Sequence, residues 1–177
     1  MNVPISRTIY VACDPGKNVC AFACHDSGKR GKNKWSMWKI DMPENFGARA
    51  GAVRASLEDR LKAGAHGVFV VEGQYGGPNQ ATTIRLSKVA TLVQCQALDA
   101  GYTLFNNGRV SKKGLPAEDG EVAASTWQSW MRAGGQTERD DRKAMAMGYA
   151  RKLVGVDLND QDMADAVCMV DWMMKNG

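Results

Sequence analysis

The fold can be inferred outward from one segment, TIYVACDPG at residues 8–16. Its β-branched and aromatic residues favour a strand, and Asp14-Pro15-Gly16 is a turn signal that ends it. Residues 19–24 alternate small and large apolar side chains and predict a second strand, which forms a hairpin with the first. A basic, glycine-containing turn at 28–33 then leads into a third strand at 35–40. Three strands joined by short turns predict an antiparallel meander.

The hydrophobic period changes after the third strand. Apolar residues three or four positions apart predict helices, whereas the short apolar run from Val68 to Glu72 is typical of a strand buried on both faces. The predicted helices are 45–63, 79–100, 122–133, 140–153 and 160–175, with a further strand at 102–105 and a loop at 106–120. This order predicts an α/β fold in which a mixed five-stranded sheet, an antiparallel meander followed by βα units, is flanked by helices.

Length and composition indicate one globular domain over residues 1–177, with 44% hydrophobic and 24% charged residues. No apolar run approaches the roughly 18 residues of a membrane span, and the N-terminus does not resemble a signal peptide, so we expect a cytoplasmic protein. Five cysteines without a Cys-x-x-Cys pair fit a reduced compartment. Cys20, Cys24 and His25 are conceivable zinc ligands, but no second ligand pair follows at zinc spacing.

The net charge of +4 is mild, but the cations are clustered. Residues 27–40 carry five cations and no acid, and a second basic set runs from Arg132 to Lys152. Such clusters suggest a polyanionic partner, although solvated faces explain them equally simply.

Four acids occupy unusual positions. Asp14 and Glu72 each directly follow an apolar strand, and Asp162 and Asp165 lie three residues apart at the start of the last helix. Singly, they have plain explanations: a turn residue, a solvated strand end, and acids favoured by the helix dipole. If the two strands are neighbours, however, all four converge. Divalent cations with hard oxygen ligands relieve such repulsion, and two ions about 3.5–4 Å apart support phosphodiester cleavage.

These motifs resemble the RuvC family of Holliday-junction resolvases, which includes phage members and belongs to the RNase H-like (retroviral integrase) superfamily. The matching residues are Asp14-Pro15-Gly16, Glu72 within VVEGQY (70–75), and DMADA (162–166). The resemblance implies that Asp14, Glu72, Asp162 and Asp165 are catalytic metal ligands for two Mg²⁺ ions, which Mn²⁺ can replace. It also implies a homodimer that nicks opposing strands of a junction, and we expect the helix at 79–100 to form the dimer contact.

The resemblance also suggests residues that touch DNA. Tyr75 lies three residues after Glu72, where the family places an aromatic wedge, although a plain loop tyrosine is an equal alternative. The family also carries basic residues before and at the start of its penultimate helix. Since residues 106–140 depart from the family pattern, two pairs can correspond to them: Lys112 and Lys113, or Arg142 and Lys143. We expect further phosphate contacts from the basic turn, namely Lys29, Arg30, Lys32 and Lys34. Trp127 and Trp130 are interpreted as core or interface residues.

The function expected from these features is a structure-selective, metal-dependent endodeoxyribonuclease that resolves four-way and related branched DNA by paired nicks. It would act beside the nucleoid, or in the host cytoplasm if a phage encodes it. Two alternatives stay open: another RNase H-like nuclease that cuts RNA in hybrids, and an inert protein that binds branched DNA. A sugar-kinase-like phosphotransferase would need a second phosphate-binding half, for which 177 residues are too few.

Overall fold

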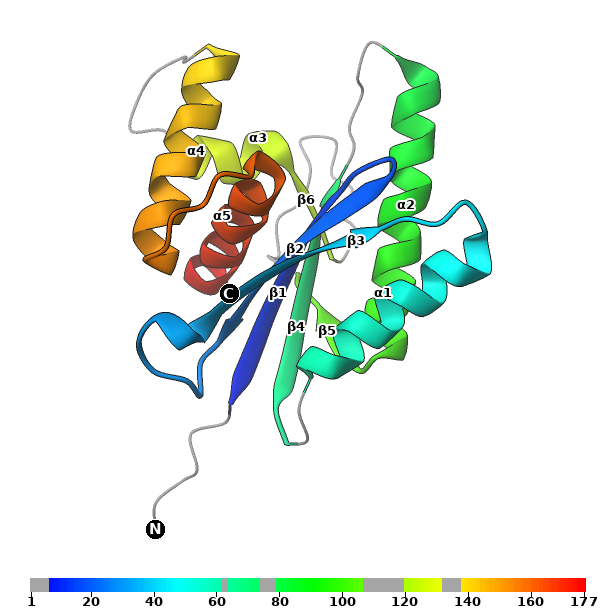
Figure 1. The fold of residues 1–177 in the computed structure, drawn as a ribbon, viewed down its shortest axis with the longest axis horizontal. Coiled ribbons are helices and arrows are strands. Elements are labelled where there is room, and N and C mark those ends of the chain that lie inside the picture. The colour runs from blue at the N-terminus through cyan, green and yellow to red at the C-terminus, as the bar shows by residue number, and fades with distance from the viewer. Residues whose placement is uncertain (1–6, 62–63, 74–78, 107–119, 132–137) are drawn as a thin grey trace.

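The computed structural model describes residues 7–61, 64–73, 79–106, 120–131 and 138–177. At its centre is a six-stranded mixed sheet in which five strands follow the order β3-β2-β1-β4-β5, while β6 pairs with β4 (Figure 1). The strands are β1 (Thr8–Pro15), β2 (Val19–Asp26), β3 (Trp35–Asp41), β4 (His66–Gly73), β5 (Tyr102–Leu104) and β6 (Glu121–Ala123). The first three are antiparallel, whereas β4 is parallel to β1, β5 and β6. The predicted meander and mixed sheet are therefore confirmed.

Helices cover both faces of the sheet. Figure 1 shows α1 (Phe46–Arg60) and α2 (Gln80–Asp99) on one side of the sheet and α3 (Ala124–Met131), α4 (Arg139–Val154) and α5 (Gln161–Asn176) on the other. Each face has its own apolar core. We call these the α1/α2 core and the α5 core.

Strand alternation divides the apolar residues of the sheet between the two cores. In β1, Ile9, Val11 and Cys13 pack in the α1/α2 core, and Tyr10 and Ala12 pack in the α5 core. Because side chains alternate along a strand, the next residue, Asp14, faces the α5 side. The Asp14 side chain therefore lies on the side of the sheet that α5 covers.

The helix boundaries follow the capping signals in the sequence. Asn45, Asn79 and Asp160 are the N-caps of α1, α2 and α5, and the side chain of each accepts a hydrogen bond from a backbone N–H of the first turn. Gly101, with a φ of 91°, directly follows the C-cap of α2 in the left-handed conformation that glycine adopts most readily. In α5 the buried residues are not confined to one face of the helix, because the helix lies between the sheet and α4.

The strand β6 was not predicted, since residues 122–133 were expected to be helical throughout. β5 is only three residues long and pairs with Gly67–Phe69, which leaves the rest of that edge of β4 open. β6 pairs with Val71–Gly73 and continues the same edge. Buried backbone N–H and C=O groups need hydrogen-bond partners, and β6 supplies them to this edge of β4. The pairing overrides the local helical pattern, so α3 begins only at Ala124.

Gly16 limits what the turn after β1 can accept. A Cβ there would lie 2.1 Å from the Val19 carbonyl oxygen, so Gly16→Ala must shift the backbone. We expect a loss of about 1–3 kcal/mol in unfolding free energy, measured by chemical denaturation. Gly51→Ala is the matched control, because a Cβ there meets nothing within 4 Å. It should stabilise α1 by about 0.5–1 kcal/mol. Equal effects of the two substitutions would contradict the steric argument.

Candidate active site

Asp14 and Glu72 lie side by side at the C-terminal ends of two neighbouring strands. β1 and β4 are parallel, with Ala12 opposite Val70 and Cys13 opposite Val71. One step further, Asp14 and Glu72 both face the α5 side, and their carboxyl groups are within hydrogen-bonding reach. The convergence expected for neighbouring strands is present.

The start of α5 brings two more acids to the same place. Asp160 caps the helix by accepting a hydrogen bond from the Met163 amide at 3.0 Å. The following turns pack Ala166 and Val167 into the α5 core, and this packing directs Asp165 towards the strand ends. The charges of Asp162 and Asp165 raise the pKa of both Asp14 and Glu72, so all four acids form one electrostatic cluster.

Burial makes this cluster costly. Burial and the charge of Glu72 raise the pKa of Asp14 well above its usual value. Burial likewise raises the pKa of Glu72 to about 7 and that of Asp165 to about 6. The three groups would be more stable with a proton or a cation among them.

Several side chains hold the acids in place, and sequence analysis assigned none of them to the site. The Trp127 indole donates to Glu72 Oε1 at 3.1 Å, and Gln161 Nε2 donates to Asp165 Oδ1 at 2.8 Å. Lys39 Nζ lies 3.2 Å from Asp162 Oδ2 and 2.5 Å from Asp160 Oδ2. Gln161 could have been found from its spacing of four residues before Asp165. Trp127 gives no such signal, because its partner is 55 positions away.

Cations line a cavity beside two of the acids. The cavity has a volume of about 200 Å³, and its lining includes Glu72 and Asp165 together with three cations of α4, Arg139, Arg142 and Lys143. The charge of Lys143 lowers the pKa of Asp165, against the larger effect of burial. Of the two basic pairs considered from the sequence, the described residues Arg142 and Lys143 thus adjoin the acids.

The basic turn lies away from the four acids. Lys29, Arg30, Lys32 and Lys34 lie between β2 and β3, where β2 ends opposite Ile9, whereas Asp14 pairs with Ala21 at the other end of the hairpin. At about 3.3 Å per residue the two places are roughly 20 Å apart. The antiparallel hairpin reverses the chain, so a turn after β2 must lie away from the end of β1. The other three DNA-contact candidates, Tyr75, Lys112 and Lys113, lie outside the described residues.

The donor set suits a hard divalent cation, since it consists of carboxylates with uncompensated charge. Among the described residues, however, no three His, Cys, Asp or Glu side chains are arranged to hold a metal ion as they stand. Glu72, Asp165 and Asp162 instead contact Trp127, Gln161 and Lys39, respectively. The chemistry of the carboxylates fits a divalent cation, and Asp162, whose side chain is 56% exposed, is the acid of the four that pairs with a lysine.

Comparisons with solved structures identify the fold. The Thermus thermophilus RuvC complex with a Holliday-junction substrate superposes with a TM-score of 0.60 at 13% identity, covering 92% of this chain and 90% of that one. A second structure of Thermus thermophilus RuvC gives 0.56 at 14% identity, with the same coverage. The Mn-soaked human cytomegalovirus terminase nuclease domain gives 0.53 at 12% identity, covering 97% and 86%. No family model and no curated protein matches the sequence. The chain therefore has a RuvC-type, RNase H-like fold.

The raised pKa values of Glu72 and Asp165 predict that metal-free stability falls as pH rises. The ordinary values are 4.5 and 3.8, so between about pH 4 and pH 7 the folded state binds more protons than the unfolded state. Their stabilising contribution is complete below this window and lost above it. We expect the melting temperature to fall more between pH 5 and pH 8 in the wild type than in Glu72→Gln.

The comparison with Glu72→Gln is needed because other groups also titrate. Burial lowers the pKa of His25, which has the opposite effect on stability, but this effect is common to both proteins. Thermal melts in EDTA provide the measurement. Parallel pH profiles for the wild type and Glu72→Gln would show that the carboxyl cluster carries no excess charge.

Proposed function

We propose that this protein is a metal-dependent endodeoxyribonuclease that resolves four-way and related branched DNA junctions by paired nicks. The observation that carries the proposal is the cluster of Asp14, Glu72, Asp162 and Asp165 at the strand ends of an RNase H-like fold. The likeness to a RuvC structure with a Holliday-junction substrate supports branched DNA over a hybrid duplex.

The four acids would hold the metal, with Mg²⁺ as the proposed ion and Mn²⁺ as a substitute. Mn was soaked into the terminase nuclease domain of similar fold, which supports this class of ion. When bound, such ions activate water and stabilise the leaving oxygen of a phosphodiester. The protein's own part is positional: Trp127 orients Glu72 and Gln161 orients Asp165.

The DNA backbone would be guided by cations next to the acids and by others farther away. Arg139, Arg142 and Lys143 border the cavity next to Glu72 and Asp165, where they offset the repulsion between carboxylates and phosphates. The basic turn from Lys29 to Lys34 would contact a more distant stretch of the same substrate. Tyr75, Lys112 and Lys113 remain DNA-contact candidates from the sequence alone. No helix in the described part of the chain is long and apolar enough to cross a membrane.

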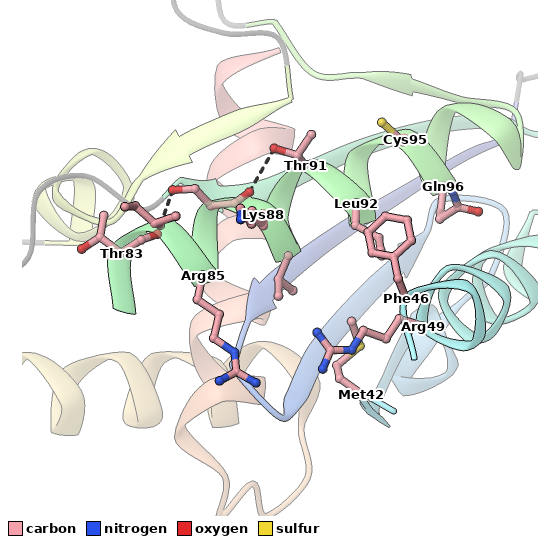
Figure 2. Close-up of a pocket in the computed structure, with 13 residues that line it drawn as sticks. Met42, Phe46, Arg49, Thr83, Arg85, Lys88, Thr91, Leu92, Cys95 and Gln96 are labelled. Carbon is pink, nitrogen blue, oxygen red and sulfur yellow. Dashed lines mark hydrogen bonds between the residues drawn. The ribbon is translucent and has the colours of Figure 1, made fainter. Parts of the chain in front are cut away.

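Paired nicks require two active sites, and the face opposite α5 offers a surface for a second copy of the chain. α1 and α2 border an apolar groove of about 740 Å³, shown in Figure 2 with Phe46 and Leu92 among its labelled residues. Phe46 and Ile84, which line it, are 70% and 49% exposed. An exposed apolar patch of this kind is typical of a surface that binds another protein, and a two-fold dimer would bury the same patch on both copies. Arg49, Arg85 and Lys88 also line the groove.

Removing one acid should abolish cleavage without abolishing binding. In Asp14→Asn or Asp162→Asn, we expect cleavage of a four-way junction to fall by more than the roughly 10- to 100-fold that loss of an outer-shell partner costs. Junction affinity should stay close to that of the wild type, because the acids do not bind phosphates. Gel assays with four-way, three-way, duplex and hybrid substrates, with and without Mg²⁺, measure both properties.

Asp59→Asn is the control for this experiment, because Asp59 lies on α1, on the opposite face, with a side chain that is 73% exposed. It should cleave normally. Cleavage of hybrids alone would favour the ribonuclease alternative. Junction binding without cleavage under any metal condition would favour the inert DNA-binding protein.

A charge placed in the groove should dissociate the proposed dimer. We expect light scattering to show a dimer for the wild type at micromolar concentration with junction DNA, and a monomer for Ile84→Glu. Val156→Glu is the matched control: Val156 is 47% exposed but follows α4 on the other face, so it should stay dimeric. A monomeric wild type under these conditions would contradict the paired-nick mechanism.

A further inference from the structure

Lys39 lies in a row that crosses the sheet from the acidic cluster. Asp14 pairs with Ala21 on β2, and Ala21 pairs with Lys39 on β3. Trp35 and Met37 of β3 pack against the α5 core, so the alternation places Lys39 on the same face as Asp14 and Glu72. Two strand spacings, or roughly 10 Å, separate Lys39 from Asp14 along the row. From this position the lysine side chain reaches the start of α5.

The ammonium group of Lys39 is shared between two carboxylates of that helix start. It lies 2.5 Å from Asp160 Oδ2 and 3.2 Å from Asp162 Oδ2, and the Lys39 side chain is 30% exposed. The hydrogen bond with Asp160 raises the pKa of Lys39, so the ammonium stays charged. Asp160 meanwhile uses its other oxygen to cap α5. Lys39 can therefore give up Asp162 and remain paired with Asp160.

The four acids differ in whether a basic side chain forms an ion pair with them. Within the described part of the chain, Asp162 forms an ion pair, whereas Asp14, Glu72 and Asp165 do not. Asp162, a proposed metal ligand, is thus also the acid of the four that is held by a lysine. Removing the metal would leave this cluster with excess negative charge, and an ammonium fixed on β3 offsets part of that charge in its absence.

We propose that Lys39 is a tethered cation that holds Asp162 in the metal-free protein and competes with the divalent ion for this carboxylate. Binding of the ion then releases Asp162 from Lys39, which stays paired with Asp160 and keeps the start of α5 against β3. The role assigned to Lys39 rests on the proposed function, because it presumes that Asp162 is a metal ligand. Lys39 is accordingly a positioning residue, and its effect is on metal affinity before any effect on cleavage.

The test is metal binding without DNA. Calorimetric titration with Mn²⁺ should show about three- to fivefold tighter binding in Lys39→Met than in the wild type, as expected for loss of a partly exposed ion pair. The melting temperature of Lys39→Met in EDTA should be lower, since the acids lose their counter-ion. Lys39→Arg keeps the charge and should resemble the wild type. Lys152→Met removes one charge from an exposed position at the end of α4 and should leave Mn²⁺ affinity unchanged.

A double-mutant cycle separates competition for Asp162 from a general gain of negative charge. In an Asp162→Asn background, Lys39→Met should no longer tighten Mn²⁺ binding. Equal tightening in both backgrounds, or unchanged or weaker binding in Lys39→Met, would overturn the proposal. Lys39→Gln serves as the second uncharged variant if circular dichroism shows that Lys39→Met does not fold. A wild type that binds neither Mn²⁺ nor Mg²⁺ would instead overturn the proposed function, so the two failures are distinguishable.

Discussion

Repulsion among partly buried carboxylates is the constraint on which the arrangement of this protein depends. Asp14, Glu72 and Asp165 have raised pKa values because burial and their mutual charges disfavour ionisation. Isolated acids would move into solvent to avoid this cost. Here they cannot, because two separate cores fix the strands from both faces, and the packing of α5 fixes the last acid. The fold therefore supplies the free energy that keeps the charges together.

The charged neighbours of the cluster are divided between its two sides. Lys39 holds the exposed side at Asp160 and Asp162, whereas Arg139, Arg142 and Lys143 border the cavity beside Glu72 and Asp165. None of these cations forms a salt bridge with Asp14, Glu72 or Asp165 among the described residues. The cluster thus keeps an uncompensated charge at its centre, which is the property that a hard cation would use.

The sheet also separates two kinds of surface. The α5 face carries the acids and the cavity, and the α1/α2 face carries the apolar groove with the exposed Phe46 and Ile84. Because each face has its own core, a substitution on the groove need not disturb the acids.

The sequence by itself determined the meander, the helices and the mixed sheet, because strand alternation, helical spacing, turn residues and caps are local signals. It also showed Asp14, Glu72, Asp162 and Asp165 at strand ends and a helix start, which the fold brings together. Only the tertiary structure decided the rest. β6 forms because β4 has an open edge, Trp127 reaches Glu72 across 55 positions, and the basic turn lies away from Asp14 because the hairpin reverses the chain. Lys39 reaches Asp162 across 123 positions, a pairing that depends on strand register and on the docking of α5. Local periodicity carries no information about such contacts, since they arise only when distant segments share one core.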